Sequence, residues 1–457
     1  MAAKRCSPPL RIGQGHSWQT ASVRNGLSSP FRVWGNMGCG DLPHAKHPTL
    51  MADRNLRCAF LTYFPYWPGE ALLACRGLEL VAFEPGVVGL PPDPNPFGLE
   101  EHDHADVALV SAWWHRWLYS QHPERADEVM RAIERHADVV VGLDGPDRFG
   151  LTFPPAAMDR FGIVVKFQGV YRDRDLYNYV VGPQYDGANW TEKVRPQRER
   201  YSTAMLEKLR LSVPSFLTEF PAVRRRTRER ETTSTRMGRR HMSQAERVAR
   251  NLAEAVVPHA IGIANGRGRT LDVHCLTGLS HVQRIEAIRR LEGLSGTLGI
   301  APTQGVAPSL ISGTEYGGED LPPDVAAKLA AEANAFARAP RGRLGFLLDL
   351  RRHRVAVAPT GYGEIGNRHG LALMSGAALV CQDVRHVDMM LPLVDRENVM
   401  FCRPDLSDLR RVVEELLADD ALRQRIGTAG RRSWLRWARD SDVLLYSGLE
   451  AHIREVV

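Results

Sequence analysis

Short apolar runs alternate with amphipathic segments along the first half of the chain, once the first fifty residues are passed. A continuous apolar run is typical of a strand buried on both faces of a parallel sheet. Between two such runs, Val129, Met130 and Ile133 lie on one stripe of a helix expected over 124–136. The apolar runs predict strands at 56–63, 107–113, 138–143 and 163–167. This alternation of strands and helices favours a doubly wound parallel sheet.

The same rhythm returns after residue 269. Helices are expected from Gln283 onward, where 280–283 has the pattern of a capping box, and over 325–339, 368–375 and 409–417. Strands are expected at 270–276, 354–358 and 377–382. The pattern therefore predicts an α/β protein with two Rossmann-like, doubly wound domains.

Breaks in this pattern predict the domain boundaries. Residues 1–50 are rich in Gly, Ser, Pro and Arg and lack periodicity, which is typical of a disordered extension. The first α/β domain is expected over 51–220 and the second over 269–440, with a final helix over 441–457. Between the two domains, 221–268 is expected to be a basic linker or helical connection.

Composition agrees with a globular protein, since 44% of the 457 residues are hydrophobic and 25% are charged. No run of about 18 apolar residues predicts a membrane span. The seven cysteines form no CxxC pair, which favours reduced thiols and a cytoplasmic location.

The net charge of +6 is too modest to indicate a nucleic-acid partner, because no basic groove with interleaved aromatics can be traced. An arginine-rich run lies at 224–240. It is interpreted either as a solvated linker or as a basic strip that contacts anionic lipid at a membrane surface.

Candidate chemistry gathers at two places in the second domain. The turn at 277–280 is followed by Arg284, about one turn into its helix. The second place is a glycine loop that runs into a helix; it contains Gly361, Gly363, Glu364, Arg368 and His369. In an open α/β sheet, ligands bind beyond the carboxyl ends of the strands, where helix N-termini and guanidinium groups suit phosphate. These residues predict a pocket for a nucleotide diphosphate that carries a sugar.

The order of these features resembles a known family. The stretch Arg-His-Gly-Leu-Ala-Leu-Met-Ser-Gly at 368–376, followed by an apolar run, resembles the donor-site helix and strand of GT-B glycosyltransferases of the group 1 and spore-maturation kinds. Residues 398–405 and 417–431 resemble the strand and helix pair of the family's tail. The resemblance covers roughly 270–445.

The resemblance implies two domains facing a cleft, a UDP- or GDP-type sugar donor on the second domain, and a glycan, lipid-linked or protein acceptor on the first. Arg284 would meet the diphosphate and Arg368 would be the arginine at the start of the donor-site helix, without a metal or other cofactor. The chain departs from the family at Leu371, where a glutamate usually holds the ribose. Glu364 lies in place for the first glutamate of the family's pair.

An inverting transferase also needs a general base beside the acceptor hydroxyl. Asp144 and Asp147, at the end of an apolar strand, are the first candidates, and His115 is the second. The nearby Trp113, Trp114 and Trp117 either stack on a sugar or pack in the core.

Two other functions stay open on the sequence. Leu371 favours a non-catalytic GT-B-like protein that binds a glycan or a nucleotide. A sugar-nucleotide epimerase of the same architecture would need an acid–base pair and no acceptor.

Overall fold

The computed structural model describes most of the chain from residue 54 onward, and all described residues belong to one compact unit, Met51–Val457. Asp147, Gly361, Gly363, Glu364, the segment 1–50 and almost all of 224–240 lie outside the described residues. The description covers 54–62, 71–72, 74–85, 104–145, 150–185, 190–214, 216–217, 220, 222–223, 226, 268–279, 282–301, 322–339, 341, 343–360 and 365–457.

The first sheet has six strands, all parallel, in the order β2-β1-β3-β4-β5-β9. Every residue of β3 is buried, as expected for a strand covered on both faces. Its strands are β1 (Leu56–Thr62), β2 (Leu78–Pro85), β3 (Ala105–Ser111), β4 (Ala137–Asp144), β5 (Ile163–Lys166) and β9 (Leu209–Leu211). The predicted doubly wound sheet is therefore confirmed for this half.

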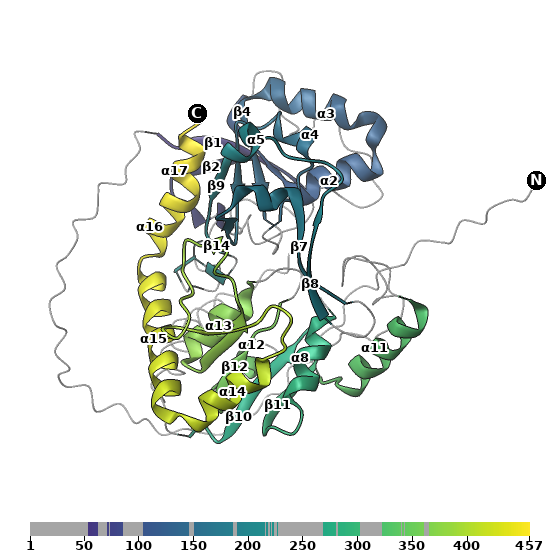
Figure 1. Ribbon diagram of the computed structural model, residues 1–457. Coiled ribbons are helices and arrows are strands. Elements are labelled where there is room, and N and C mark those ends of the chain that lie inside the picture. The colour runs from purple at the N-terminus through teal and green to yellow at the C-terminus, as the bar shows by residue number, and fades with distance from the viewer. Residues whose placement is uncertain are drawn as a thin grey trace, which may run out of the picture. The chain divides into compact units, whose positions relative to one another are not determined.

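Three helices lie together beside this sheet, α2 (Ala112–Gln121), α3 (Pro123–His136) and α4 (Pro155–Met158) (Figure 1). The helix predicted over 124–136 is confirmed as α3. The strand predicted over 107–113 ends two residues earlier, because Ser111 caps α2 by accepting a hydrogen bond from the Trp114 amide. Trp113 therefore belongs to a helix and not to a strand.

The second sheet repeats the plan with five parallel strands in the order β11-β10-β12-β13-β15. Its strands are β10 (Leu271–Thr277), β11 (Gly296–Ile300), β12 (His353–Val357), β13 (Ala378–Gln382) and β15 (Met400–Cys402). Its helices are α8 (Gln283–Leu291), α11 (Pro323–Ala335), α12 (Arg343–Leu350), α13 (Asn367–Ser375) and α14 (Leu409–Ala418). A core of apolar side chains from β10, β12 and β13 packs against α8, α11 and α14.

The last helices of the chain begin against the second sheet, where Gly427 packs on Gly376, and end against the first. They are α15 (Asp420–Arg439), α16 (Ser441–Leu445), a π-helical stretch at Tyr446–Glu450 and α17 (Ala451–Arg454). Arg210 in β9 forms an ion pair of 2.7 Å with Glu455, and the Gly77 amide donates to Glu450. The end of the chain is therefore fixed to the sheet that opens it (Figure 1).

Shorter elements complete the described structure. Strands β7 (Tyr179–Tyr185) and β8 (Trp190–Pro196) form an antiparallel hairpin, and β6 (Val170–Tyr171) pairs with β14 (Val387–Asp388). The remaining helices are the 3-10 helix Arg174–Asn178 and α5 (Thr203–Glu207).

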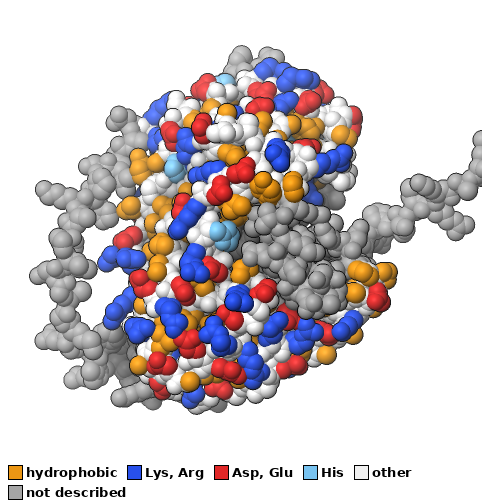
Figure 2. Space-filling model, viewed as in Figure 1, with side chains coloured by type: hydrophobic (Ala, Val, Ile, Leu, Met, Phe, Trp, Pro, Cys, Tyr) orange, Lys and Arg blue, Asp and Glu red, His pale blue; other side chains and the backbone are white. Residues whose placement is uncertain are grey.

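The described surface mixes both signs of charge. Figure 2 shows Lys and Arg side chains interleaved with Asp and Glu over the region where Figure 1 places α14 and α15. Within the described part of the chain, the helices are too short or too polar to cross a bilayer.

Candidate functional site

The candidate donor residues lie at the carboxyl edge of the second sheet. Because β10, β12, β13 and β15 are parallel, the segments that follow them meet at the same edge. Of the six donor residues predicted from the sequence, Gly361, Gly363 and Glu364 lie outside the described residues. Side-chain contacts decide which of Arg284, Arg368 and His369 come together.

Arg284 lies in the first turn of α8 and is only 8% exposed. Its Nη1 donates to the Gly278 carbonyl over 2.6 Å, and its Nε donates to the Thr360 carbonyl over 3.0 Å. These carbonyls follow β10 and β12, respectively. The guanidinium group therefore joins two neighbouring loops at the carboxyl edge.

Arg368 is the second residue of α13, and its Nε donates to the Leu276 carbonyl over 3.2 Å. Its Nη2 lies 3.8 Å from the position that a Cβ on Gly278 would occupy. Burial lowers the pKa of Arg368, and no carboxylate among the described residues forms an ion pair with it. Both arginines therefore converge on Leu276–Gly278, although they come from helices more than 80 residues apart in sequence.

His369 adds a buried imidazole beside this pair. Its Nδ1 lies 3.1 Å from the Gly366 amide and 3.3 Å from the Gly366 carbonyl, so both contacts of this nitrogen are to the residue that precedes α13. That Nε2 is buried and has no hydrogen-bond partner. Burial, together with the charges of Arg284 and Arg368, lowers the pKa of His369 to about 3. Near neutral pH the ring is therefore uncharged, and its Nε2 is a polar atom without a partner.

Two glutamines that the sequence reasoning missed hold the surrounding loops. Gln382, the last residue of β13, accepts from the Thr360 amide over 2.7 Å and from its hydroxyl over 2.6 Å. It donates to Gln283 over 2.9 Å and to the Pro404 carbonyl over 3.1 Å. The sequence signal for Gln382 was its position, since it is the polar residue that ends the apolar run at 377–382. The network fixes Thr360, which in turn accepts from Arg284.

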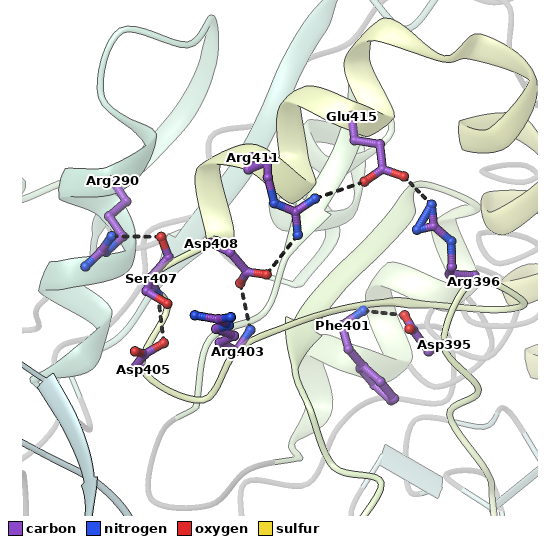
Figure 3. Close-up of polar contacts among 10 residues, drawn as sticks. All are labelled: Arg290, Asp395, Arg396, Phe401, Arg403, Asp405, Ser407, Asp408, Arg411 and Glu415. Carbon is purple, nitrogen blue, oxygen red and sulfur yellow. Dashed lines mark hydrogen bonds and ion pairs between the residues drawn. The ribbon is translucent and has the colours of Figure 1, made fainter.

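The loop after β15 is also fixed by polar contacts, which Figure 3 shows. The Arg403 amide donates to Asp408 over 2.8 Å, and Asp408 also accepts from Arg411 over 3.0 Å. Arg290 of α8 donates to the Ser407 carbonyl over 3.2 Å. The exposed Arg403 side chain has no ion-pair partner among the described residues. It therefore brings a third guanidinium to the segments that follow the sheet.

The first sheet carries a buried ion pair at its own carboxyl edge. Asp144 ends β4 and lies opposite Lys166, which ends β5. Their side chains are fully buried, with Nζ 3.3 Å from Oδ1, and the second carboxylate oxygen accepts from the Thr152 amide over 2.7 Å. Asp144 is thus held as a partner of Lys166, and a role as general base, which would require the pair to open, stays a prediction.

His115, the other described base candidate, lies in α2 and is 2% exposed. Its ring stacks on Tyr119 with centroids 4.4 Å apart and meets Phe153 edge-on. Burial lowers the pKa of His115 to about 4, with the Arg160 charge adding to the effect. Of the three nearby tryptophans, Trp114 and Trp117 are buried in the core, whereas Trp113 is 39% exposed.

These buried histidines predict a loss of stability in mild acid. Besides His115 and His369, His274 of β10 is buried. The pKa values of His115, His274 and His369 are about 4, 3 and 3, all lowered mainly by burial from 6.5. The unfolded chain therefore binds more protons, so the free energy of unfolding falls as the pH drops from about 6.5 to about 4. Urea unfolding at pH 7.5 and 4.5 measures this loss. We expect a smaller loss in His115→Phe, and an equal loss in both proteins would contradict the assignment.

Within the described residues, no group of three His, Cys, Asp or Glu side chains is arranged to hold a metal ion. The groups that come together at the second sheet are guanidinium, imidazole and amide donors. Such donors bind oxygen-rich anions.

Comparison with known proteins gives matches only at the level of structure. No family model and no curated protein matches the sequence. The UDP-forming α,α-trehalose-phosphate synthase of Burkholderia xenovorans has a TM-score of 0.39 and 13% identity, over 77% of this chain and 73% of its own. BGT of phage T4 has a TM-score of 0.36 and 12% identity, over 87% of this chain and 99% of its own. A UDP-N-acetylglucosamine 2-epimerase has a TM-score of 0.34 and 10% identity, over 85% and 96%.

The structural neighbours are mainly GT-B glycosyltransferases. At these identities and TM-scores the likeness gives no donor, acceptor or site for this chain. The α/β fold with two Rossmann-like sheets, predicted from the sequence, is confirmed by the two parallel sheets themselves.

Proposed function

We propose that the protein is a glycosyltransferase that moves a hexose from a UDP- or GDP-type sugar to a hydroxyl acceptor. The observation that carries the proposal is the convergence of Arg284 and Arg368 on the segment after β10. A sequence resemblance to GT-B donor sites supports the same positions. The acceptor would be a glycan, a lipid-linked sugar or a protein, held by the first domain across a cleft.

The charge balance of the site supports a diphosphate ligand. Two guanidinium groups lie together, and the described residues supply no carboxylate ion pair to Arg368. The neutral His369 adds a buried Nε2 that has no partner, and in the tautomer with its proton on this nitrogen it would donate to the ligand. Diphosphate oxygens would accept from these groups, and arginine binds phosphate with two parallel hydrogen bonds.

The same groups suit the chemistry of transfer. When the bond between the sugar and the β-phosphate breaks, negative charge grows on the nucleoside diphosphate that leaves. Fixed donors that point at this charge stabilise the transition state more than the ground state. Arg284 and Arg368 are fixed by backbone carbonyls, so little reorganisation is needed when the charge develops.

Two further parts of the proposal concern location. We place the protein in the cytoplasm, on the sequence pattern of its cysteines. Contact of the 224–240 run with a membrane surface stays a proposal of its own, since that run lies almost wholly outside the described residues.

A donor panel tests the function. The full chain is incubated with UDP-, GDP- and ADP-linked hexoses, with and without a mixture of oligosaccharide acceptors, and released nucleoside diphosphate is measured. We expect one donor to be consumed faster when acceptor is present. The matching nucleoside diphosphate at about 100 times its Kd should stabilise the fold by about 2.7 kcal/mol in a thermal-shift assay.

Two outcomes would contradict the proposal in different ways. A new sugar nucleotide formed without acceptor would identify an epimerase. A stabilising nucleotide with no turnover of any donor would identify a binding protein, the role that Leu371 favours.

A further inference from the structure

A hollow of about 670 Å³ lies on the flank of the first sheet, away from the residues assigned to the donor. It opens to solvent and is bordered by α2, α3, α4 and the segments on either side of α4. Its lining includes Trp113, His115, Arg116, Tyr119, Asp127 and Arg160. Figure 1 shows the three helices grouped beside the sheet. The volume is that of sites for small molecules, which usually occupy 300–1,000 Å³.

Helix α2 supplies one wall of the hollow through its 3.6-residue period. Trp113, Arg116 and Ser120 lie three and four residues apart and so share one stripe, while His115 and Tyr119 form the stripe beside it. The first stripe is the more exposed, and the second is anchored against Phe153 and Phe161. The wall therefore carries an aromatic ring, a cation and polar groups within two turns.

Two arginines line the hollow, and only Arg160 is paired with carboxylates among the described residues. Arg160 forms ion pairs with Asp127 at 2.7 Å and with Glu134 at 3.1 Å, and Asp127 also accepts from the Tyr119 hydroxyl. Arg116 is exposed and has no carboxylate partner among the described residues; its guanidinium carbon lies 5.8 Å from the centre of the Trp113 ring. The charge left over in the lining is therefore the positive charge of Arg116.

His115 supplies an unused polar group at the same wall. It is 2% exposed, and its Nε2 has no hydrogen-bond partner. A buried polar atom without a partner destabilises the fold. A ligand hydroxyl that reached Nε2 would supply the missing hydrogen bond.

We propose that the hollow binds a saccharide that carries a carboxylate or a phosphate. The face of the sugar ring would lie on the exposed Trp113 indole, the anionic group would bind the Arg116 guanidinium, and hydroxyl groups would meet His115 and Ser120. Aromatic rings offer sugars a flat apolar surface, and guanidinium groups bind carboxylate and phosphate alike. Trp113 and His115 are also the residues that the sequence suggested for the acceptor side, but binding of a saccharide here needs no nucleotide and is tested apart from transfer.

Isothermal titration of the full chain with four probes tests the site. Glucose 6-phosphate and glucuronate carry both features, glucose carries only the ring, and inorganic phosphate carries only the charge. We expect at least one of the two acidic sugars to bind at least about tenfold more tightly than glucose and than phosphate, since a hydrogen bond to a charged group contributes about 1.5–3 kcal/mol. Comparison of the two acidic sugars shows which anion the site prefers.

Variants place the binding. Arg116→Ala and Trp113→Ala should each weaken the acidic sugar by about tenfold or more. Arg131→Ala, an exposed arginine of α3 outside the lining, and Arg368→Ala at the donor residues should leave it unchanged. Only variants whose melting temperature equals that of the wild-type protein are compared. If Arg116→Ala is unstable, Trp113→Ala provides the second test.

Four results would overturn the proposal. If glucose bound as tightly as the acidic sugars, the anionic group would not be recognised. If inorganic phosphate bound as tightly, the sugar ring would not be recognised. No binding of either acidic sugar at millimolar concentration would remove the site. If Arg368→Ala abolished binding of the acidic sugar and Arg116→Ala left it intact, the ligand would bind at the second sheet. Loss of nucleotide binding alone concerns the donor residues and does not contradict this site.

Discussion

Arg368→Ala should weaken the binding of the nucleoside diphosphate by about 10- to 100-fold. A hydrogen bond to a charged group contributes about 1.5–3 kcal/mol, and burial beside Arg284 excludes water that would otherwise compete. Arg368→Lys keeps the charge but loses the planar pair of donors. Its affinity for the nucleotide should therefore lie between those of the wild-type protein and Arg368→Ala. Isothermal titration with the nucleotide that stabilises the wild-type protein measures the change.

The matched control is Arg432→Ala. Arg432 is an exposed arginine on α15, in the helix whose Gly427 packs against Gly376, the residue that ends α13 before β13 begins. This control therefore lies toward the amino edge of the sheet and removes the same charge. Equal affinities in Arg368→Ala and Arg432→Ala, with both proteins folded, would contradict the site.

Lys166→Met should lower the free energy of unfolding by about 3–5 kcal/mol. Lys166 and Asp144 are fully buried, so removal of the ammonium group leaves the carboxylate in the interior without its partner. Urea unfolding at neutral pH measures the loss. Most of it should return in the double variant Asp144→Asn, Lys166→Met, since no unpaired charge then remains.

The exposed pair Arg172–Asp388 offers the comparison. Its side chains are 63% and 57% exposed, and the Nε to Oδ1 distance is 2.9 Å. Arg172→Ala should therefore cost at most about 1 kcal/mol. If Lys166→Met cost no more than Arg172→Ala, the buried pair would not be formed in solution.

Much of the fold could be predicted from the sequence because its strands are continuous apolar runs. The runs at 138–143 and 354–358 became β4 and β12, with ends shifted by one residue. The apolar run at 107–113 predicts that Trp113 belongs to the strand, whereas it lies in α2. A single hydroxyl, the cap at Ser111, ends the strand before it.

The candidate site could be predicted in part for a similar reason. Parallel strands place the segments after them at one edge, so Arg284 and Arg368 could be expected together. The pairing of Asp144 with Lys166 depends on the register of β4 and β5, which local patterns do not contain. The hollow beside α2 depends on how three helices pack, which needs side-chain shapes as well as periodicity.

The central claim is that a diphosphate binds between Arg284 and Arg368 at the carboxyl edge of the second sheet. A crystal structure with the stabilising nucleoside diphosphate tests it most directly. The account predicts phosphate oxygens within hydrogen-bond distance of both guanidinium groups, with His369 Nε2 nearby. A nucleotide bound elsewhere, with both arginines still engaged only by Leu276, Gly278 and Thr360, would contradict it.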